Sequence, residues 1–239
     1  MKRSILCFML VVVFTMPAVA MAEVNGVYLA PRFLLGIQDS GQLSRSGPAT
    51  DDMFTQHSQA VFGGALAAGF NFAPKFKIPL RTEIEFALRS NSSNSKDGVD
   101  QGGGRWESKQ MMNLSTLFFN AYFDIDTGTP FTPYLGGGLG MAFNYSSISG
   151  NWRPSDLGAA LGIPPGSFSK SRYDTTFAWN LGAGLSYAFT ENVAADLGYR
   201  FISTGQRDLR ATWSDDGQRV KVGSSPYIHE FYLGARFTF

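Results

Sequence analysis

The last fourteen residues of the chain, Pro226 to Phe239 (PYIHEFYLGARFTF), place the strongest constraint on its fold. Every second residue from Tyr227 to Phe239 is apolar or aromatic except His229, and the residues between them include Glu230 and Arg236. A period of two is typical of a β-strand with one apolar and one polar face. This strand runs to the final residue and ends on an aromatic ring, although chain ends of soluble proteins tend to fray. The ending therefore favours a strand held along its whole length.

The first 22 residues are predicted to be an export signal rather than part of the fold. Lys2 and Arg3 precede an apolar run from Ile5 to Met16, and small residues follow. This order is typical of a secretory signal peptide. The run is about 12 residues long, shorter than the roughly 20 that a transmembrane helix needs. We expect cleavage after Ala22, with Ala20 as the second choice.

The remaining segment, residues 23–239, is expected to form one domain. The single cysteine lies in the signal segment, which excludes disulfides and thiolate catalysis from the mature chain. Without Lys2 and Arg3 the chain has 18 basic and 19 acidic residues, so its charge does not suggest nucleic-acid binding. The apolar residues come in short alternating pieces, and glycine and aromatic residues are plentiful. This combination favours a membrane barrel over a soluble β-sandwich, in which the outer faces of both sheets would be polar.

Seven further segments alternate in the same way and predict eight strands in all. The predicted strands are Gly26–Gln38, His57–Phe72, Ile78–Ser90, Ser108–Ile125, Phe131–Tyr145, Arg172–Phe189, Asn192–Ser203 and Pro226–Phe239. Long polar connections alternate with short turns, as in barrels whose turns face the periplasm and whose loops face outward. In the fourth strand Phe118 and Phe119 are adjacent, which leaves its facing open; we favour Phe119 outward. The fold class is therefore all-β, an eight-stranded antiparallel transmembrane β-barrel in an up-and-down meander.

Three stretches carry a family resemblance: the aromatic C-terminal strand, Phe131–Gly140 (FTPYLGGGLG) and Leu197–Phe201 (LGYRF). With these the mature chain resembles the eight-stranded outer-membrane barrels of the opacity-protein and surface-antigen type, and is similar to the membrane domain of OmpA-like proteins. The resemblance implies a surface location in a Gram-negative bacterium. It also implies that the assembly machinery reads the C-terminal strand ending at Phe239. Family members include adhesins and immune-evasion antigens. No peptidoglycan-binding domain is expected after the barrel.

An eight-stranded barrel is just wide enough for side chains to fill its interior. The inward positions carry nine charged residues: Arg32, Arg81, Glu83, Glu85, Arg89, Asp196, Arg200, Glu230 and Arg236. Buried charges must be paired or hydrated. We expect Arg200, Asp196, Glu230 and Arg236 to pair across the last two strands, and barrel closure to bring Arg32 beside Arg236. The set predicts a salt-bridge plug, with a narrow ion path as the alternative.

Inward glycines such as Gly136, Gly138 and Gly140 lack the lysine and following helix of a phosphate-binding loop. We expect them to leave room for arginine and tyrosine side chains opposite.

The four long connections are longer than ordinary loops, which calls for an explanation. Their candidate contact residues are Trp152, Arg207, Arg210, Trp213, Arg219 and Lys221. Basic and aromatic groups on exposed loops suit anionic glycans or host proteins; alternatively, mobile loops shield the surface.

Catalysis is not expected. The two histidines, His57 and His229, lack the spacing to serine and carboxylate that a lipid-deacylating site would need, and Glu230 points away from His229. No metal-ligand spacing occurs, and no cofactor is expected.

The leading hypothesis is an outer-membrane surface protein, structural or adhesin-like, that presents four loops to a host or the environment. The second is a small porin-like channel, and a lipid-modifying enzyme is a distant third. Expected partners are outer-membrane lipid and lipopolysaccharide, the barrel-assembly machinery, and a host or glycan ligand on the loops.

Overall fold

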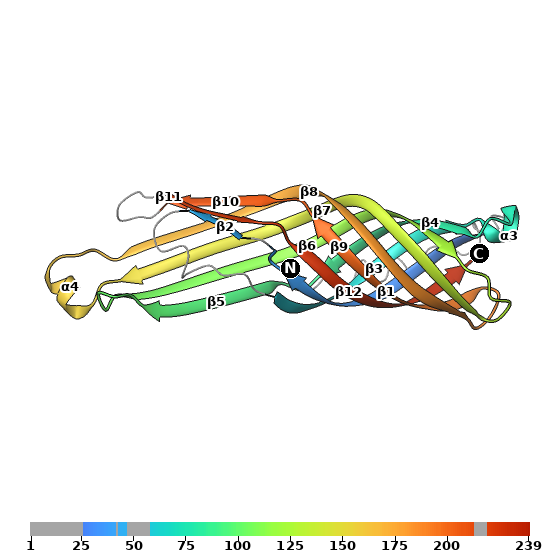
Figure 1. Ribbon diagram of the computed structural model, residues 1–239, viewed down its shortest axis with the longest axis horizontal. Coiled ribbons are helices and arrows are strands. Elements are labelled where there is room, and N and C mark those ends of the chain that lie inside the picture. The colour runs from blue at the N-terminus through green and yellow to red at the C-terminus, as the bar shows by residue number, and fades with distance from the viewer. Residues whose placement is uncertain (1–25, 42, 47–57, 213–218) are drawn as a thin grey trace, which may run out of the picture.

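The computed structural model describes residues 26–41, 43–46, 58–212 and 219–239. Within them the chain forms an elongated β-barrel that continues as sheet beyond one end (Figure 1). The barrel strands are β1 (Val27–Asp39), β3 (Ser58–Asn71), β4 (Leu80–Arg89), β6 (Arg105–Asp124), β7 (Phe131–Arg153), β8 (Gly166–Ala188), β9 (Val193–Thr204) and β12 (Tyr227–Thr238).

Each barrel strand pairs antiparallel with its neighbours in this order, and the β1–β12 and β4–β6 pairings close the ring. The predicted eight-stranded up-and-down barrel is confirmed. The C-terminal strand is held along its length because β1 and β9 flank it on both sides. The signal-peptide prediction concerns residues outside the described part of the chain.

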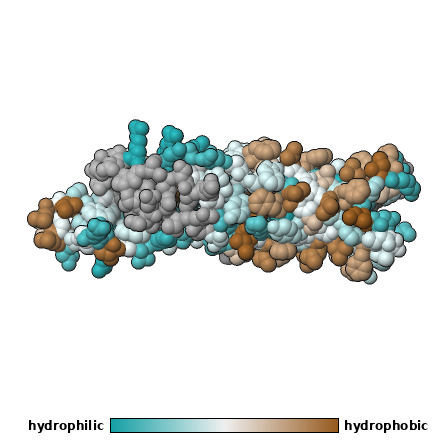
Figure 2. Space-filling view, in the orientation of Figure 1, coloured by the Kyte–Doolittle hydropathy of each residue, from teal (hydrophilic) through white to brown (hydrophobic). Residues whose placement is uncertain are grey.

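The apolar faces of the strands point outward, and on the face seen in Figure 2 the apolar residues gather on one half of the molecule, which we call the apolar band. Exposed residues such as Phe33, Leu139 and Leu181 belong to this band. Phe119 is 57% exposed and Phe118 only 1%, which confirms the favoured facing of the fourth strand. Aromatic pairs such as Tyr145–Tyr173 and Phe131–Tyr187 lie at the two ends of the apolar stretch of β7 and β8. The pattern matches the lipid-facing band and aromatic girdles of outer-membrane barrels.

The connections at the periplasmic end are short. Between β3 and β4 lies α3 (Ala73–Phe76), which begins with a proline in its first turn and ends at Lys77 in the left-handed conformation. In the turn before β7, the Asp126 carboxylate accepts a hydrogen bond from the Gly128 amide at 2.9 Å. Neither described helix is long or apolar enough to cross a bilayer.

At the other end, the strand limits predicted from the sequence are too short. Strands β7 and β8 continue past the predicted ends Tyr145 and Arg172 and pair as far as Trp152 with Gly166. The predicted third loop is therefore mostly a hairpin, and only its tip, with α4 (Asp156–Ala160), is not strand. Outside the membrane a strand needs no apolar outer face, so Ser- and Gly-rich segments pair equally well.

The other predicted loops also contain strands. Strand β5 (Ser92–Val99) pairs with the extended part of β6. Strands β10 (Arg207–Thr212), β11 (Arg219–Ser224) and β2 (Leu43–Ser46) form a separate three-stranded sheet.

Inward glycines and tyrosines interlock on neighbouring strands. A Cβ built on Gly198 would lie 2.3 Å from the ring of Tyr232, and one on Gly184 would lie 2.3 Å from the ring of Tyr134. The expectation that inward glycines leave room for arginine and tyrosine side chains holds here and at Gly136, which faces Tyr122, whereas Gly138 and Gly140 face Asn120 and Phe118. Because no side chain occupies the glycine position, the hydroxyl end of each ring can approach the neighbouring backbone closely.

Candidate functional site: the lumen and the extracellular end

A chain of ion pairs crosses the middle of the lumen. The Arg32 guanidinium contacts Glu83, with Nη1 at 2.5 Å from Oε1, and also contacts Glu85. Glu85 Oε1 in turn lies 2.7 Å from Arg200 Nη1. Arg200 Nη2 then meets Glu230 Oε1 at 2.7 Å, and Arg89 Nε meets Glu230 Oε2 at 2.6 Å. We call this set, Glu83–Arg32–Glu85–Arg200–Glu230–Arg89, the charge layer.

The strand register explains part of this arrangement. Glu230 on β12 lies directly opposite Arg200 on β9. Glu83 and Glu85 share one face of β4 because they are two residues apart. Arg89, also on β4, reaches Glu230 across the lumen, since β4 and β12 are not adjacent strands.

The remaining predicted charges lie nearer the periplasmic end. Arg81 Nε donates to Asp124 Oδ2 at 2.7 Å, and Arg236 Nη2 lies 3.6 Å from Asp196 Oδ1. Arg32 lies opposite Gly234 rather than Arg236, and the two arginines have different ion-pair partners.

The lumen also contains functional groups outside the predicted set of charged residues. The hydroxyls of Tyr28 and Tyr122 donate to Glu83 at 3.0 and 2.9 Å, and the Tyr134 and Tyr232 hydroxyls lie 3.0 Å apart. The guanidinium carbons of Arg32 and Arg200 lie 5.1 and 5.4 Å from the centre of the Tyr232 ring. The sequence signal that could have identified these tyrosines is an inward tyrosine opposite an inward glycine on the neighbouring strand.

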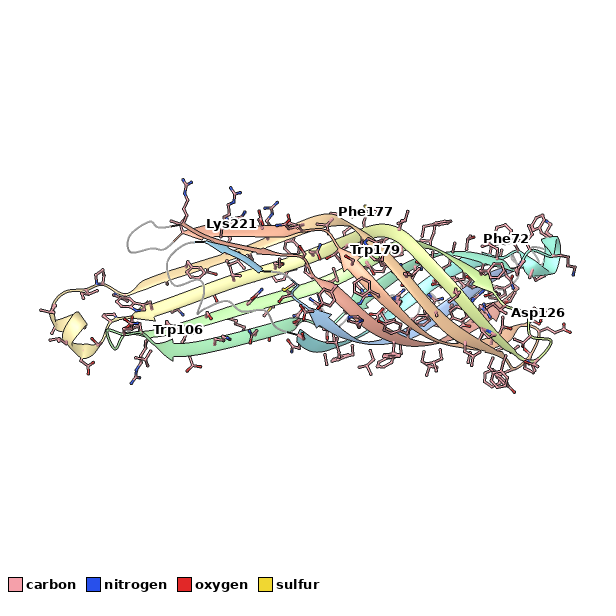
Figure 3. The ribbon with its side chains drawn as sticks, in the orientation of Figure 1. Phe72, Trp106, Asp126, Phe177, Trp179 and Lys221 are labelled. Carbon is pink, nitrogen blue, oxygen red and sulfur yellow. The ribbon has the colours of Figure 1, made fainter. Side chains whose placement is uncertain are left out.

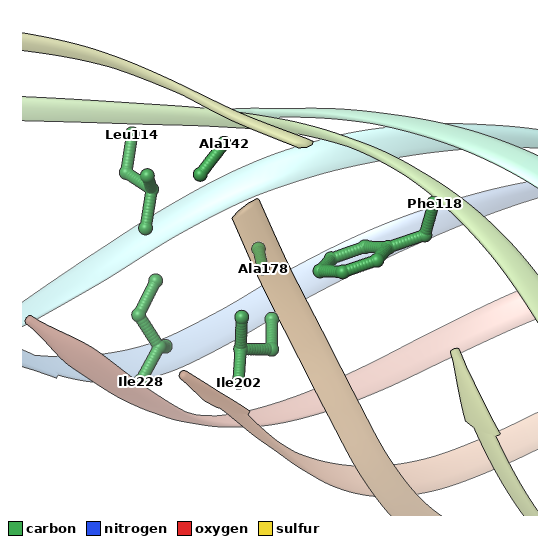
Figure 4. Packing of buried hydrophobic residues seen from close by; sticks show 6 residues of the cluster. All are labelled: Leu114, Phe118, Ala142, Ala178, Ile202 and Ile228. Atoms are coloured by element: carbon green, nitrogen blue, oxygen red, sulfur yellow. The ribbon is translucent and has the colours of Figure 1, made fainter. Parts of the chain in front are cut away.

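A second layer of the lumen is apolar. It consists of Leu114, Phe118, Ala142, Ala178, Ile202 and Ile228, all at most 1% exposed (Figure 4). Ile202 follows Arg200 on β9, and Ile228 precedes Glu230 on the antiparallel strand β12, so both isoleucines lie one inward position closer to the extracellular end. This apolar layer therefore lies on the extracellular side of the charge layer. An ion moving through the barrel would have to lose its water against aliphatic side chains, which is unfavourable.

The extracellular tip combines the β5–β6 turn with α4. The Asp100 carboxylate accepts hydrogen bonds from Trp152 Nε1 at 2.7 Å and from the Gly104 amide at 2.8 Å. These bonds, the one from the indole first, hold the pKa of Asp100 below its ordinary value. Trp106 lies directly opposite Trp152 on the neighbouring strand. The β5–β6 turn is thereby fixed to β7, close to α4 (Figure 3).

The tip is apolar on its outer side. Leu157 and Leu161 are 71% and 73% exposed, and Val99 and Ile163 are also exposed. An open cleft of about 770 Å³ lies beside them, lined by residues that include Trp106, Trp152 and Ile163. Of the predicted loop contacts, Trp152 is the one that belongs to this tip.

The basic loop candidates lie elsewhere. Arg210 and Arg219 are exposed on β10 and β11, and Lys221 Nζ lies 3.0 Å from Asp208 Oδ2. Arg207 begins β10, but its side chain is not among those described, and Trp213 lies outside the described residues. The candidates whose side chains are described, Trp152 at the tip and the basic residues of β10 and β11, therefore do not form one site.

The histidines do not build a catalytic group in the described chain. His57 lies outside the described residues, and His229 is exposed on the outer face, with Nδ1 2.7 Å from the Tyr199 hydroxyl. No three His, Cys, Asp or Glu residues among those described are placed to hold a metal ion.

The family model for the outer membrane protein beta-barrel domain matches residues 6–239. The chain belongs to this family. The barrel is accordingly an outer-membrane protein of a bacterium, and its apolar band marks the part that crosses the membrane.

Outer membrane protein PagN of Salmonella typhimurium is 27% identical over 187 residues, which cover 76% of this chain and 74% of PagN. The adhesin candidate RC1281 of Rickettsia conorii is 25% identical over 181 residues, which cover 75% of this chain and 68% of RC1281. Among solved structures, Neisserial surface protein A is similar with a TM-score of 0.47 and 20% identity, covering 90% of this chain and 100% of that one.

Proposed function

We propose that this protein is a surface adhesin whose extracellular tip makes the contact with another surface. The observation that carries the proposal is the tip itself. Strand β7 runs ten residues beyond Phe143, its last strongly apolar outward residue, to Arg153. At about 3.3 Å per residue this places α4 roughly 30 Å farther along the strand.

Large apolar side chains that cluster on a water-exposed surface mark interaction sites. Leu157, Leu161 and Ile163 cluster on and after α4, and Asp100 and Trp152 fix the adjoining turn. A fixed apolar surface loses little conformational freedom on binding. The similarity to an adhesin candidate supports the same function.

A pore is the alternative function, and the filled lumen argues against it. The charge layer and the apolar layer would both have to rearrange before ions could pass. An enzymatic function has no support in the described residues, since His229 faces outward beside Tyr199 and away from Glu230.

We further infer that the first 22 residues direct export and that the C-terminal strand ending at Phe239 is recognised during assembly. The pairing of β12 with β1 supports the second inference, because this strand must be in place before the barrel can close.

The tip is tested by replacing Leu157 and Leu161 together with serine. Fully burying one leucine is worth about 1.5–3 kcal/mol, so we expect beads coated with the refolded double variant to bind cultured epithelial cells at least tenfold less than wild-type beads. The matched control replaces both leucines with methionine, which keeps the apolar surface and should keep the binding. Equal binding by the serine variant and wild type would refute the proposal.

A further inference from the structure

The extracellular wall of the barrel is split between β8 and β10. The ladder between β8 and β9 ends at Ala178 opposite Thr204, and one further backbone bond joins the Gly205 amide to the Phe177 carbonyl at 3.0 Å. In the described part of the chain, the residues of β8 beyond Phe177 form a ladder with β7 alone. Strand β10 pairs with β11. Between the two sheet edges lies an open cleft of about 810 Å³, which we call the β8–β10 cleft. It is lined by Lys170, Arg172, Asp174, Thr175, Thr176, Gln206, Asp208 and Arg210.

Positive charge predominates in the β8–β10 cleft. Its two carboxylates are already paired, Asp174 with Arg172 at 2.6 Å and Asp208 with Lys221 at 3.0 Å. Lys170 and Arg210 thus remain as a surplus of two positive charges among the described residues. A lysine on a free strand edge also discourages pairing with another chain. That explanation accounts for Lys170 but not for cations converging from β8, β10 and β11.

The height of the β8–β10 cleft indicates what occupies it. Phe177, 62% exposed, belongs to the apolar band, and Arg172 and Lys170 follow five and seven residues farther toward the outside. At about 3.3 Å per residue they lie roughly 17 to 23 Å along the strand from Phe177. The β8–β10 cleft thus lies at the side of the molecule, just outside the membrane and well below α4. The polar cluster of β10 and β11, with Lys221, adjoins the end of the apolar band (Figures 2 and 3).

We propose that the β8–β10 cleft binds phosphate groups on the core saccharide of a neighbouring lipopolysaccharide molecule. These phosphates lie just above the acyl chains of the outer leaflet, at the height of the cleft. Guanidinium and ammonium groups are the preferred partners of phosphate oxygens. Thr175 and Thr176 line the same cleft, and the exposed Thr175 can bond sugar hydroxyls.

The test is calorimetric titration of the refolded full-length mature protein, in zwitterionic detergent, with a rough lipopolysaccharide truncated after its phosphorylated inner core. We expect the Lys170→Gln/Arg210→Gln variant to bind about 10- to 100-fold more weakly than wild type, since two charge-assisted contacts are lost. The matched control, Lys75→Gln/Lys77→Gln, removes the same charge from exposed positions at the periplasmic end and should bind as wild type. The single Lys170→Gln variant serves if the double variant does not refold.

Two further ligands separate the sources of the anion. Chemically dephosphorylated lipopolysaccharide should bind as weakly as the double variant binds the intact molecule, and a heparin fragment should bind more weakly than lipopolysaccharide. Wild-type affinity in the double variant, or equal binding of the dephosphorylated form, would overturn the proposal. Preference for the heparin fragment would overturn it too and would assign the cleft to sulfated glycans of another cell. Neither result bears on the tip, which lies on α4 and the β5–β6 turn.

Discussion

Replacing Glu230 with alanine is expected to lower the free energy of unfolding by about 3–5 kcal/mol. The carboxylate holds Arg89 and Arg200 together, and its side chain is fully buried. Its removal leaves two guanidinium groups from β4 and β9 facing each other without the anion between them. Urea unfolding in detergent micelles, followed by tryptophan fluorescence, measures the change.

Glu191→Ala is the matched control, because Glu191 lies exposed in the turn before β9. A surface substitution of this kind should stay within about 0.5 kcal/mol of wild type. If Glu230→Ala were no less stable than Glu191→Ala, the charge layer would not hold the strands together.

Replacing Gly198 with valine is expected to destabilise the barrel by at least about 3 kcal/mol, because overpacking a closed core forces side chains and backbone to move. The new Cβ would lie 2.3 Å from the Tyr232 ring. That ring cannot move aside freely, since Arg32 and Arg200 contact it and its hydroxyl lies 3.0 Å from that of Tyr134.

The control for this substitution is Gly64→Val. A Cβ at Gly64 meets nothing closer than 3.7 Å, and the position lies in a strand of the same barrel. The mobility shift on heating in detergent gels reports folding, and urea unfolding reports stability. We expect the Gly64 variant to fold as wild type, and equal stability of the two variants would show that the tyrosine–glycine contacts do not constrain the lumen.

Strand alternation predicted the barrel because a lipid-facing strand must be apolar on every second residue. The same requirement explains why the predicted strands ended too early. Beyond the membrane, β7 and β8 are Ser-rich on their outer face, and only the inner positions Ile148, Trp152 and Phe168 keep an apolar alternation. Reading that inner face alone would have extended both strands.

Strand parity also placed the charged residues in the lumen, but it could not supply all their partners. Arg200 and Glu230 lie on neighbouring strands and are directly opposite, so register alone joins them. Arg89 reaches Glu230 across the lumen, which depends on the tilt of the strands and the length of both side chains. The β8–β10 cleft was not predicted, because the predicted sixth strand began at Arg172. Lys170 was therefore assigned to a loop and not to the same strand as Arg172.

Ion conductance across planar bilayers tests most directly whether the extracellular end, rather than the lumen, carries the function. The mature protein, shown to be folded by its mobility shift on heating, should insert and remain electrically silent. Its charge layer and apolar layer should close the lumen at two levels. Steady single-channel steps whose size changes on substituting Arg89 or Glu230 would contradict this account and assign the function to a pore.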